Sequence, residues 1–128
     1  MGKGKMTVSR MESKWRGYEF ASSISETDEF KAFARDFKRC INSIIPDGIE
    51  LVKFSRGHFY CNGFLKRDDK FIYFSIPDVR YWKDKWFNEI LIRSAENTED
   101  YTGGSNGFTN LRDFASEVVE LFDRLARD

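Results

Sequence analysis

Two stretches of helical periodicity, one on each side of a strand-rich middle, most constrain the fold of this chain. The apolar residues of the first stretch are Phe30, Phe33, Ala34, Phe37, Ile41, Ile44 and Ile45, and those of the second are Leu111, Phe114, Ala115, Val118, Leu121, Phe122 and Leu125. Spacings of three and four residues place such positions on one face of a helix. The sequence therefore predicts two amphipathic helices, each of which must bury its apolar face against another element.

Residues that favour helix ends flank both stretches. Ser25-Glu26-Thr27-Asp28 supplies a hydroxyl cap and acids for the first turn, and Pro46-Asp47-Gly48 ends that helix. Thr109 or Asn110 caps the second helix. These signals set the boundaries of the predicted helices.

The middle of the chain contains strand-like runs separated by short polar or glycine-containing turns. The runs are IELVKFS (49–55), HFYCNGFLK (58–66) and FIYFSIP (71–77). A further run, EILIRSA (89–95), fits a fourth strand better than a short helix. The predicted fold class is α+β: an antiparallel sheet of three to four strands flanked by an N-terminal and a C-terminal helix, in the order α-β-β-β-(β)-α.

The chain divides into a basic N-terminal arm and one domain. Residues 1–24 show no clear period and are expected to be partly flexible, with Trp15, Tyr18 and Phe20 docking on the domain as an extra strand. Residues 25–128 form the single α+β domain, since a chain of 128 residues suits one core.

The charge is balanced in total but unevenly placed. The chain has 21 basic and 21 acidic residues, yet residues 51–93 are mainly basic and residues 94–128 mainly acidic. No apolar run approaches a membrane span, and the charged N-terminus precedes no apolar signal segment. Cys40 and Cys61 are expected to be reduced thiols, so we expect a cytoplasmic protein.

A glycine-rich stretch precedes the second helix and matches the nucleophile pattern G-x-S-x-G. The pattern needs a buried strand before the serine and a histidine partner, but the residues before it are polar and the only histidine, His58, lies upstream. A turn with a helix cap explains the stretch. The alternative is a backbone cradle for an anion, made by Gly103, Gly104 and Ser105.

Other residues with catalytic or metal-binding chemistry show no convergent pattern. His58 and Cys61 are three apart in a predicted strand and point to opposite faces, so no metal site is predicted there. Scattered carboxylates such as Asp68 and Asp69 leave a metal-dependent nuclease as one alternative. No catalytic residue, metal ligand or cofactor is predicted.

The predicted sheet has one apolar face and one aromatic-polar face. The apolar face is made by Phe59, Cys61, Leu65, Ile72, Phe74 and Ile76, and the aromatic-polar face by His58, Tyr60, Asn62, Phe64, Phe71, Tyr73 and Ser75. If open, the second face could stack the bases of a single-stranded nucleic acid. The predicted nucleic-acid-binding residues are Lys53, Arg56, His58, Tyr60, Lys66, Arg67 and Tyr73. Alternatively, Trp15, Tyr18 and Phe20 cover this face.

The segment VRYWKDKWF (79–87) combines aromatic and basic residues that are frequent in protein interfaces. The predicted partner-binding residues are Arg80, Tyr81, Trp82, Lys83, Trp86 and Phe87. The alternative is an aromatic core with solvated lysines.

Two resemblances bear on function. The element order resembles the double-stranded RNA-binding domain, but the last helix begins with Asn110-Leu111-Arg112-Asp113 where that family has a lysine-rich run. The stretches KFSRGHFYCNGF, YFSIPDVRYW and EILIRSAENTEDYTGGSNGFTNL resemble small proteins of phages and conjugative elements of Gram-positive bacteria, over about residues 25–125. Accessory proteins of such elements include anti-CRISPR inhibitors, so this resemblance implies a protein partner such as a Cas nuclease or its RNA complex.

The leading hypothesis is a non-enzymatic binding protein of a mobile element, monomeric or homodimeric, that inhibits a host defence effector. A single-stranded nucleic-acid-binding protein is the alternative, and a metal-dependent nuclease is the third.

Overall fold

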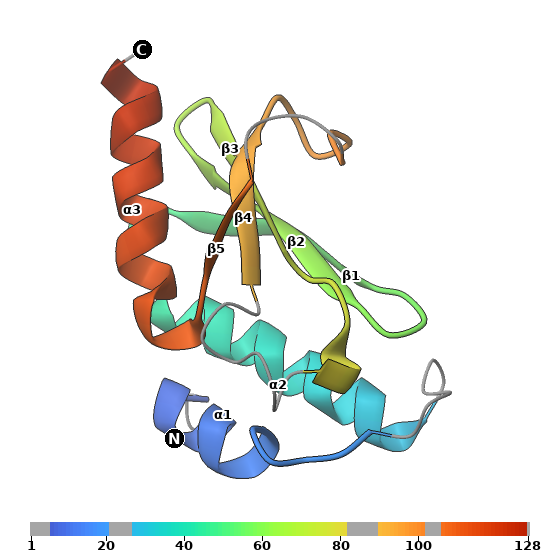
Figure 1. Ribbon diagram of the computed structural model, residues 1–128. Coiled ribbons are helices and arrows are strands. Elements are labelled where there is room, and N and C mark those ends of the chain that lie inside the picture. Colours follow the sequence, from blue (N-terminus) through green and yellow to red (C-terminus); the bar gives the residue numbers. More distant parts are fainter. Residues whose placement is uncertain (1–5, 21–26, 82–89, 102–105, 128) are drawn as a thin grey trace.

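The computed structural model describes residues 6–20, 27–81, 90–101 and 106–127 (Figure 1). Its elements are α1 (Val8–Trp15), α2 (Asp28–Ile44), β1 (Glu50–Arg56), β2 (Cys61–Arg67), β3 (Lys70–Ile76), the 3-10 turn η1 (Val79–Tyr81), β4 (Ile90–Ala95), β5 (Gly107–Thr109) and α3 (Leu111–Arg127). The predicted α+β class, with helices flanking an antiparallel sheet, is confirmed. Two elements were not predicted: the first helix and the fifth strand.

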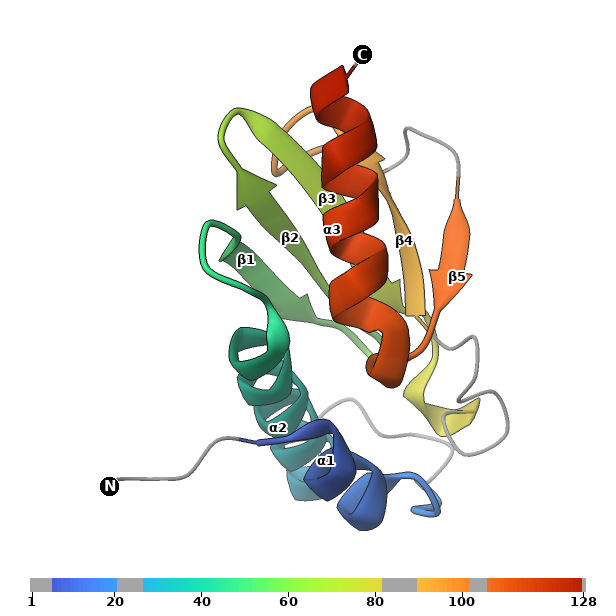
Figure 2. The ribbon, with the colours of Figure 1, turned by 90° about the vertical axis from the view of Figure 1, so that its left-hand side faces the viewer.

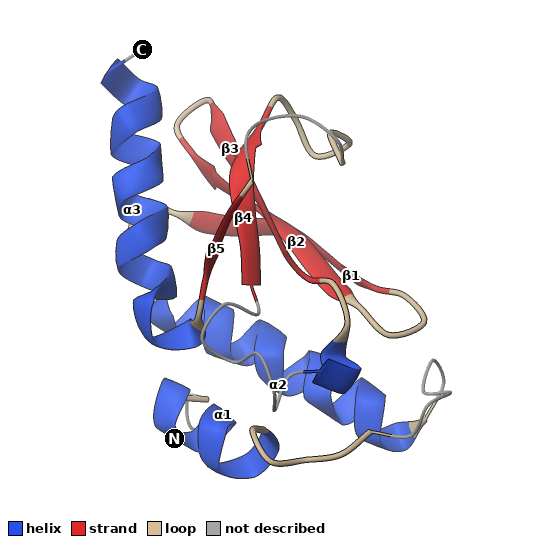
Figure 3. Cartoon of the chain, in the orientation of Figure 1, coloured by secondary structure: helices blue, strands red, loops and turns tan. Residues whose placement is uncertain are grey.

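The sheet is an antiparallel meander in the order β1-β2-β3-β4-β5. Leu65 pairs with Ile72 and Gly63 with Phe74, which places the predicted apolar residues of β2 and β3 on one face. A register shift between Leu51 and Lys53 interrupts the pairing of β1 with β2. Figure 3 shows the three helices on one side of the sheet.

Both predicted helices begin at the expected caps. The Thr27 hydroxyl accepts a hydrogen bond from the Phe30 amide at 3.2 Å, and the Asn110 side chain accepts one from the Asp113 amide at 2.9 Å. α3 contacts β3, β4 and β5, whereas α2 contacts β1 near the sheet edge (Figure 2). The core fills the space between these helices and the apolar face, with Phe37 and Phe74 fully buried.

The N-terminal residues form a helix where an extra strand was expected. In α1, Met11 and Trp15 are buried, and Val8 packs against the same core. Val8, Met11 and Trp15 follow i, i+3, i+7 spacing, so a helical signal was present in the sequence although it covers only two turns.

The aromatic residues after α1 pack on α2 and not on the aromatic face of the sheet. The Phe33 ring lies 5.5 Å from both the Trp15 and the Phe20 ring centroids, and Tyr18 contacts Trp15 and Phe20. The alternative in which these residues cover the aromatic face is therefore wrong. Their packing partner is Phe33 of α2, which is fully buried beneath them.

Candidate binding groove

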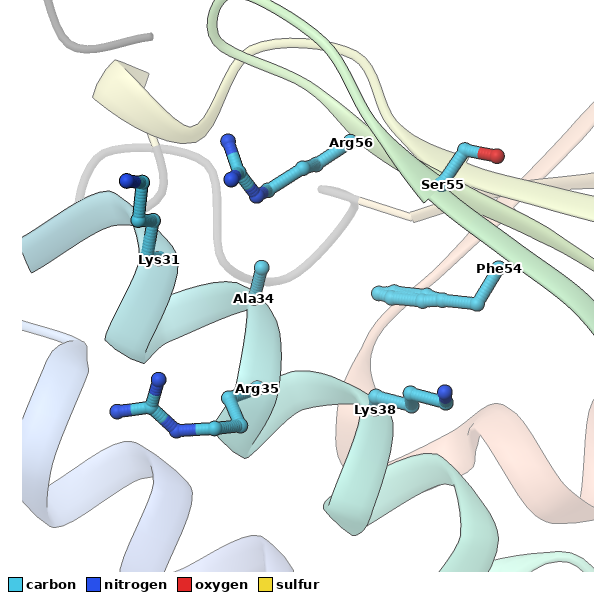
Figure 4. A pocket seen from close by; sticks show the side chains of 7 residues that line it. All are labelled: Lys31, Ala34, Arg35, Lys38, Phe54, Ser55 and Arg56. Carbon is cyan, nitrogen blue, oxygen red and sulfur yellow. The ribbon is translucent and has the colours of Figure 1, made fainter. Parts of the chain in front are cut away.

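A groove of about 350 Å³ lies between α2 and the edge strand β1 (Figure 4). Its lining residues are Lys31, Ala34, Arg35 and Lys38 from α2 and Phe54, Ser55 and Arg56 from β1. Four of these seven residues are basic and none is acidic. We call this feature the basic groove.

Helix and strand periodicity bring these cations together. Lys31, Arg35 and Lys38 stand at i, i+4 and i+7 on α2, next to the apolar stripe that faces the core. Side chains alternate along β1, so Phe54 and Arg56 point toward α2 whereas Ser55 points away (Figure 4). The groove thus forms where one helix packs against one strand.

The inner part of the basic groove is apolar. The Phe54 ring is stacked at 6.5 Å on Phe74 and lies 6.0 Å from Phe37, and Ala34 is buried beside it. The Arg56 guanidinium lies 5.7 Å from the Phe30 ring centroid. The site therefore combines an apolar floor with a cationic rim.

The rim carries charge that the rest of the described chain does not neutralise fully. Arg35 and Lys38 are exposed and form no ion pair with any residue in the described ranges. The nearby acid of α2, Asp36, points to the other side of the helix, where it binds Lys14 and Trp15. An anionic group in the groove would meet Arg35 and Lys38, whose charges no described carboxylate pairs with.

Tyr101, which follows β4, covers part of the aromatic face of the sheet. The Tyr101 ring lies 5.4 Å from Phe64 and 5.8 Å from Tyr73, and Phe64 is fully buried. The Arg93 guanidinium also lies over the Tyr73 ring, 4.5 Å from its centroid. Phe64 and Tyr73 are therefore not open to stacking by bases, because Tyr101 and Arg93 of this same chain lie against their rings.

Two buried or half-buried cations hold this cover in place. Lys53 donates to the Thr98 carbonyl at 3.0 Å and to Glu99 at 3.1 Å, and its contacts with Tyr101 and Glu99 raise the pKa of its ammonium group. Arg93 donates to the Asp100 carbonyl at 2.9 Å. We call residues 96–101 the cover segment.

The residues predicted to bind nucleic acid do not converge on one surface. Lys53 and Tyr73 lie under the cover segment, and Arg67 pairs with Asp123 of α3 at 2.9 Å. His58 and Tyr60 lie in the β1–β2 turn. Lys66 is exposed in β2, and its ammonium group lies 5.9 Å from the centroid of the Phe71 ring.

Only Arg56 of that predicted set lines the basic groove. Sequence reasoning missed Lys31, Arg35 and Lys38. Their i, i+4, i+7 spacing was a readable signal, but the partner strand could not be assigned before the fold was known.

The predicted partner-binding segment is described only at its start. Arg80 pairs with Asp78 at 2.7 Å, and its guanidinium lies 4.1 Å from the Phe59 ring. Burial tends to raise the pKa of Asp78, but the hydrogen bonds and charge of Arg80 outweigh it and lower this pKa.

Several predicted site residues lie outside what the structure describes. They are the side chain of Tyr81 and the residues Trp82, Lys83, Trp86, Phe87, Gly103, Gly104 and Ser105.

The described residues contain no reactive cysteine, no metal-binding cluster and no helix that could span a membrane. Burial raises the pKa of both Cys40 and Cys61 to about 12, so neither thiol is a nucleophile near neutral pH. His58 is exposed and Cys61 is buried, and no three His, Cys, Asp or Glu side chains of the described chain could hold a metal ion. None of the described helices is both long enough and apolar enough to cross a bilayer.

The chain matches no protein-family model, and no solved structure is significantly similar to it.

Proposed function

We propose that this chain is a non-enzymatic binding protein that holds an acidic segment of a partner protein in the basic groove. The observation that supports it is the set of four cations, Lys31, Arg35, Lys38 and Arg56, around an apolar floor. Guanidinium groups bind carboxylates through paired hydrogen bonds, which are about twice as strong as those between neutral groups.

Three features favour an acidic peptide over a nucleic acid as the ligand. The floor made by Ala34 and Phe54 suits apolar side chains that alternate with acids. Asp113, Glu117 and Glu120 lie exposed on α3, so the basic groove is a local positive site on a chain with balanced charge. The cover segment occupies the aromatic face that single-strand binders use for stacking.

The test is binding of a labelled polyglutamate peptide of about ten residues, measured by fluorescence anisotropy at about 50 mM salt, where screening is weak. The double variant Arg35→Gln/Lys38→Gln should bind about tenfold or more weakly, since it loses two charge-assisted contacts. The control Arg124→Gln/Arg127→Gln removes the same charge from exposed positions of α3 and should bind as the wild type does. Equal loss in both variants, or no binding by the wild type, contradicts the proposal.

Nucleic acid is the second candidate ligand, supported by the same four cations. A labelled single-stranded oligonucleotide, used in the same assay, should bind more weakly than the peptide. Tighter binding of the oligonucleotide, with a steep loss on adding salt and with the Arg35→Gln/Lys38→Gln variant, would replace the peptide proposal by this one.

We propose a narrower role in line with the resemblance to mobile-element proteins: inhibition of a host defence effector such as a Cas nuclease. The exposed carboxylates Asp113, Glu117 and Glu120 on α3 support it, because an acidic helix face can occupy a basic nucleic-acid channel. The assay is DNA cleavage by purified Cas nucleases with and without this protein. Glu117→Lys/Glu120→Lys should relieve inhibition, and undiminished cleavage by every effector tested contradicts the role.

The nuclease alternative is tested by incubating the DNA substrate with this protein and Mg²⁺ alone, without any Cas nuclease.

A further inference from the structure

The basic groove reaches the main chain of an edge strand. β1 pairs only with β2 within the described sheet, so its other edge has no strand partner there. Ser55 lines the groove although its side chain points away from α2, which places the main chain of β1 at the groove (Figure 4). Strand edges offer N–H and C=O groups at every second residue.

The usable part of this edge lies after the irregularity in β1. From Lys53 to Arg56, β1 keeps a regular register with β2, from Phe64 to Cys61. The register shift before Lys53, with the exposed Val52 inside it, interrupts the ladder. A bulge of this kind limits pairing with long flat strands, including those of other copies of the chain.

We propose that the acidic segment binds by strand addition: it lies beside Lys53–Arg56 as an extra strand, with its acids at every second position. This inference rests on the proposed function and adds the mode of recognition. Alternate side chains of the added strand lie on the face of Phe54 and Arg56, toward α2. The intervening side chains lie on the opposite face, with Lys53 and Ser55.

The spacing of the cations on α2 fits this mode. Alternate residues of a strand are about 6.7 Å apart, from a rise of about 3.3 Å per residue. Lys31 and Arg35 are four residues apart on the helix, which is about 6 Å along its axis. Two successive groove-facing acids of an added strand would therefore meet two successive cations.

The first experiment is selection of binders from a random-peptide library on the immobilised full chain. Selected peptides should carry Asp or Glu at alternate positions, and the Arg35→Gln/Lys38→Gln variant should not retain them. N-methylation of one selected peptide should weaken binding about tenfold or more at every second amide and have little effect at the amides between, because only alternate amides face β1.

The second experiment follows the protein itself by amide hydrogen exchange. Alternate amides within residues 53–56 should exchange fast in the free chain and become protected in the peptide complex.

Failures of the two proposals are distinguishable. Peptides that depend on Arg35 and Lys38 but carry acids three or four residues apart, or that tolerate N-methylation at every position, overturn strand addition and leave the acidic ligand in place. A library that returns no peptide dependent on these two cations overturns both proposals. An oligonucleotide that displaces the selected peptide and binds more tightly overturns them in favour of nucleic acid.

Discussion

Asp36 links α1 to α2 through a buried carboxylate. Its carboxylate is buried on α2, where it accepts a hydrogen bond from Trp15 at 2.8 Å and pairs with Lys14 at 2.8 Å. Burial tends to raise the pKa of Asp36, but the hydrogen bonds from Lys14 and Trp15 and the charges of Lys14 and Arg39 lower it overall. The contacts of Asp36 with Lys14 and Trp15 hold α1 against α2. They also keep this carboxylate on the side of α2 that faces away from the basic groove.

The ionised form of Asp36 should stabilise the fold in a pH-dependent way. Asp36→Asn should lower the free energy of unfolding by about 1–3 kcal/mol at neutral pH. Because the folded pKa lies below the ordinary value of 3.8, this contribution is present above that value and is lost as the pH falls through the folded pKa. Urea denaturation of both proteins at several pH values should show the difference narrowing below about pH 4; a constant difference contradicts the assignment.

Gly63 is required at its position by packing alone. A Cβ atom there would lie 2.7 Å from the Lys53 carbonyl oxygen and 2.7 Å from the Phe74 ring. Gly63→Ala should therefore cost about 1–3 kcal/mol, as overpacking of a core does. Gly17→Ala is the matched control, since nothing lies within 4 Å of its added methyl group. Thermal unfolding should separate the two variants, and equal melting temperatures would refute the packing argument.

At the scale of elements, the cover segment decides what the second sheet face can do. It joins β4 to the region before β5, and it is held by Lys53 from the opposite edge of the sheet and by Arg93 from the strand beside it. The same residues that suggested a base-stacking face in the sequence are the ones that bind the cover. The neighbouring aromatic and basic side chains of this face therefore bind a segment of the same chain and not an external ligand.

Removal of the Tyr101 ring should open this face. Tyr101→Ala should cost about 1 kcal/mol in unfolding free energy, since the ring is partly exposed and makes two aromatic contacts. It should also increase binding of a dye specific for apolar surface, because Phe64 loses its cover. Tyr60→Ala removes an equally exposed ring from the β1–β2 turn and should leave dye binding unchanged. Similar dye binding by both variants would show that Tyr101 is not the cover.

At the scale of the whole molecule, the basic groove is a site of unbalanced charge. Arg35 and Lys38 are like charges on neighbouring turns of α2 and repel each other in the free protein, so they favour binding of an anion but lower the stability of the fold. The Arg35→Gln/Lys38→Gln variant should therefore melt at the same temperature as the wild type or higher, while it loses peptide binding. The measurement is differential scanning calorimetry at low and high salt, where any gain should shrink as salt is added. A lower melting temperature would mean that these cations contribute to the fold.

Much of the architecture could be predicted from local patterns. The stripe from Phe30 to Ile41 and the one from Leu111 to Phe122 specified two helices, and the alternation in β2 and β3 specified which face they cover. α1 was not predicted because two helical turns give little periodicity. β5 was not predicted because it has only three residues, Gly107–Thr109, after a polar stretch. Short elements take their structure from tertiary contacts more than from their own sequence.

The sequence by itself determined the fold class, the helix caps and the apolar face of the sheet, because periodicity and capping are local properties. Only the tertiary structure decided which charges meet. Arg56 follows Lys31, Arg35 and Lys38 at a distance in sequence, and the packing of β1 against α2 brings all four to one groove. It also decided that Tyr101 closes the aromatic face, since a contact between residues far apart in the chain depends on how the elements pack.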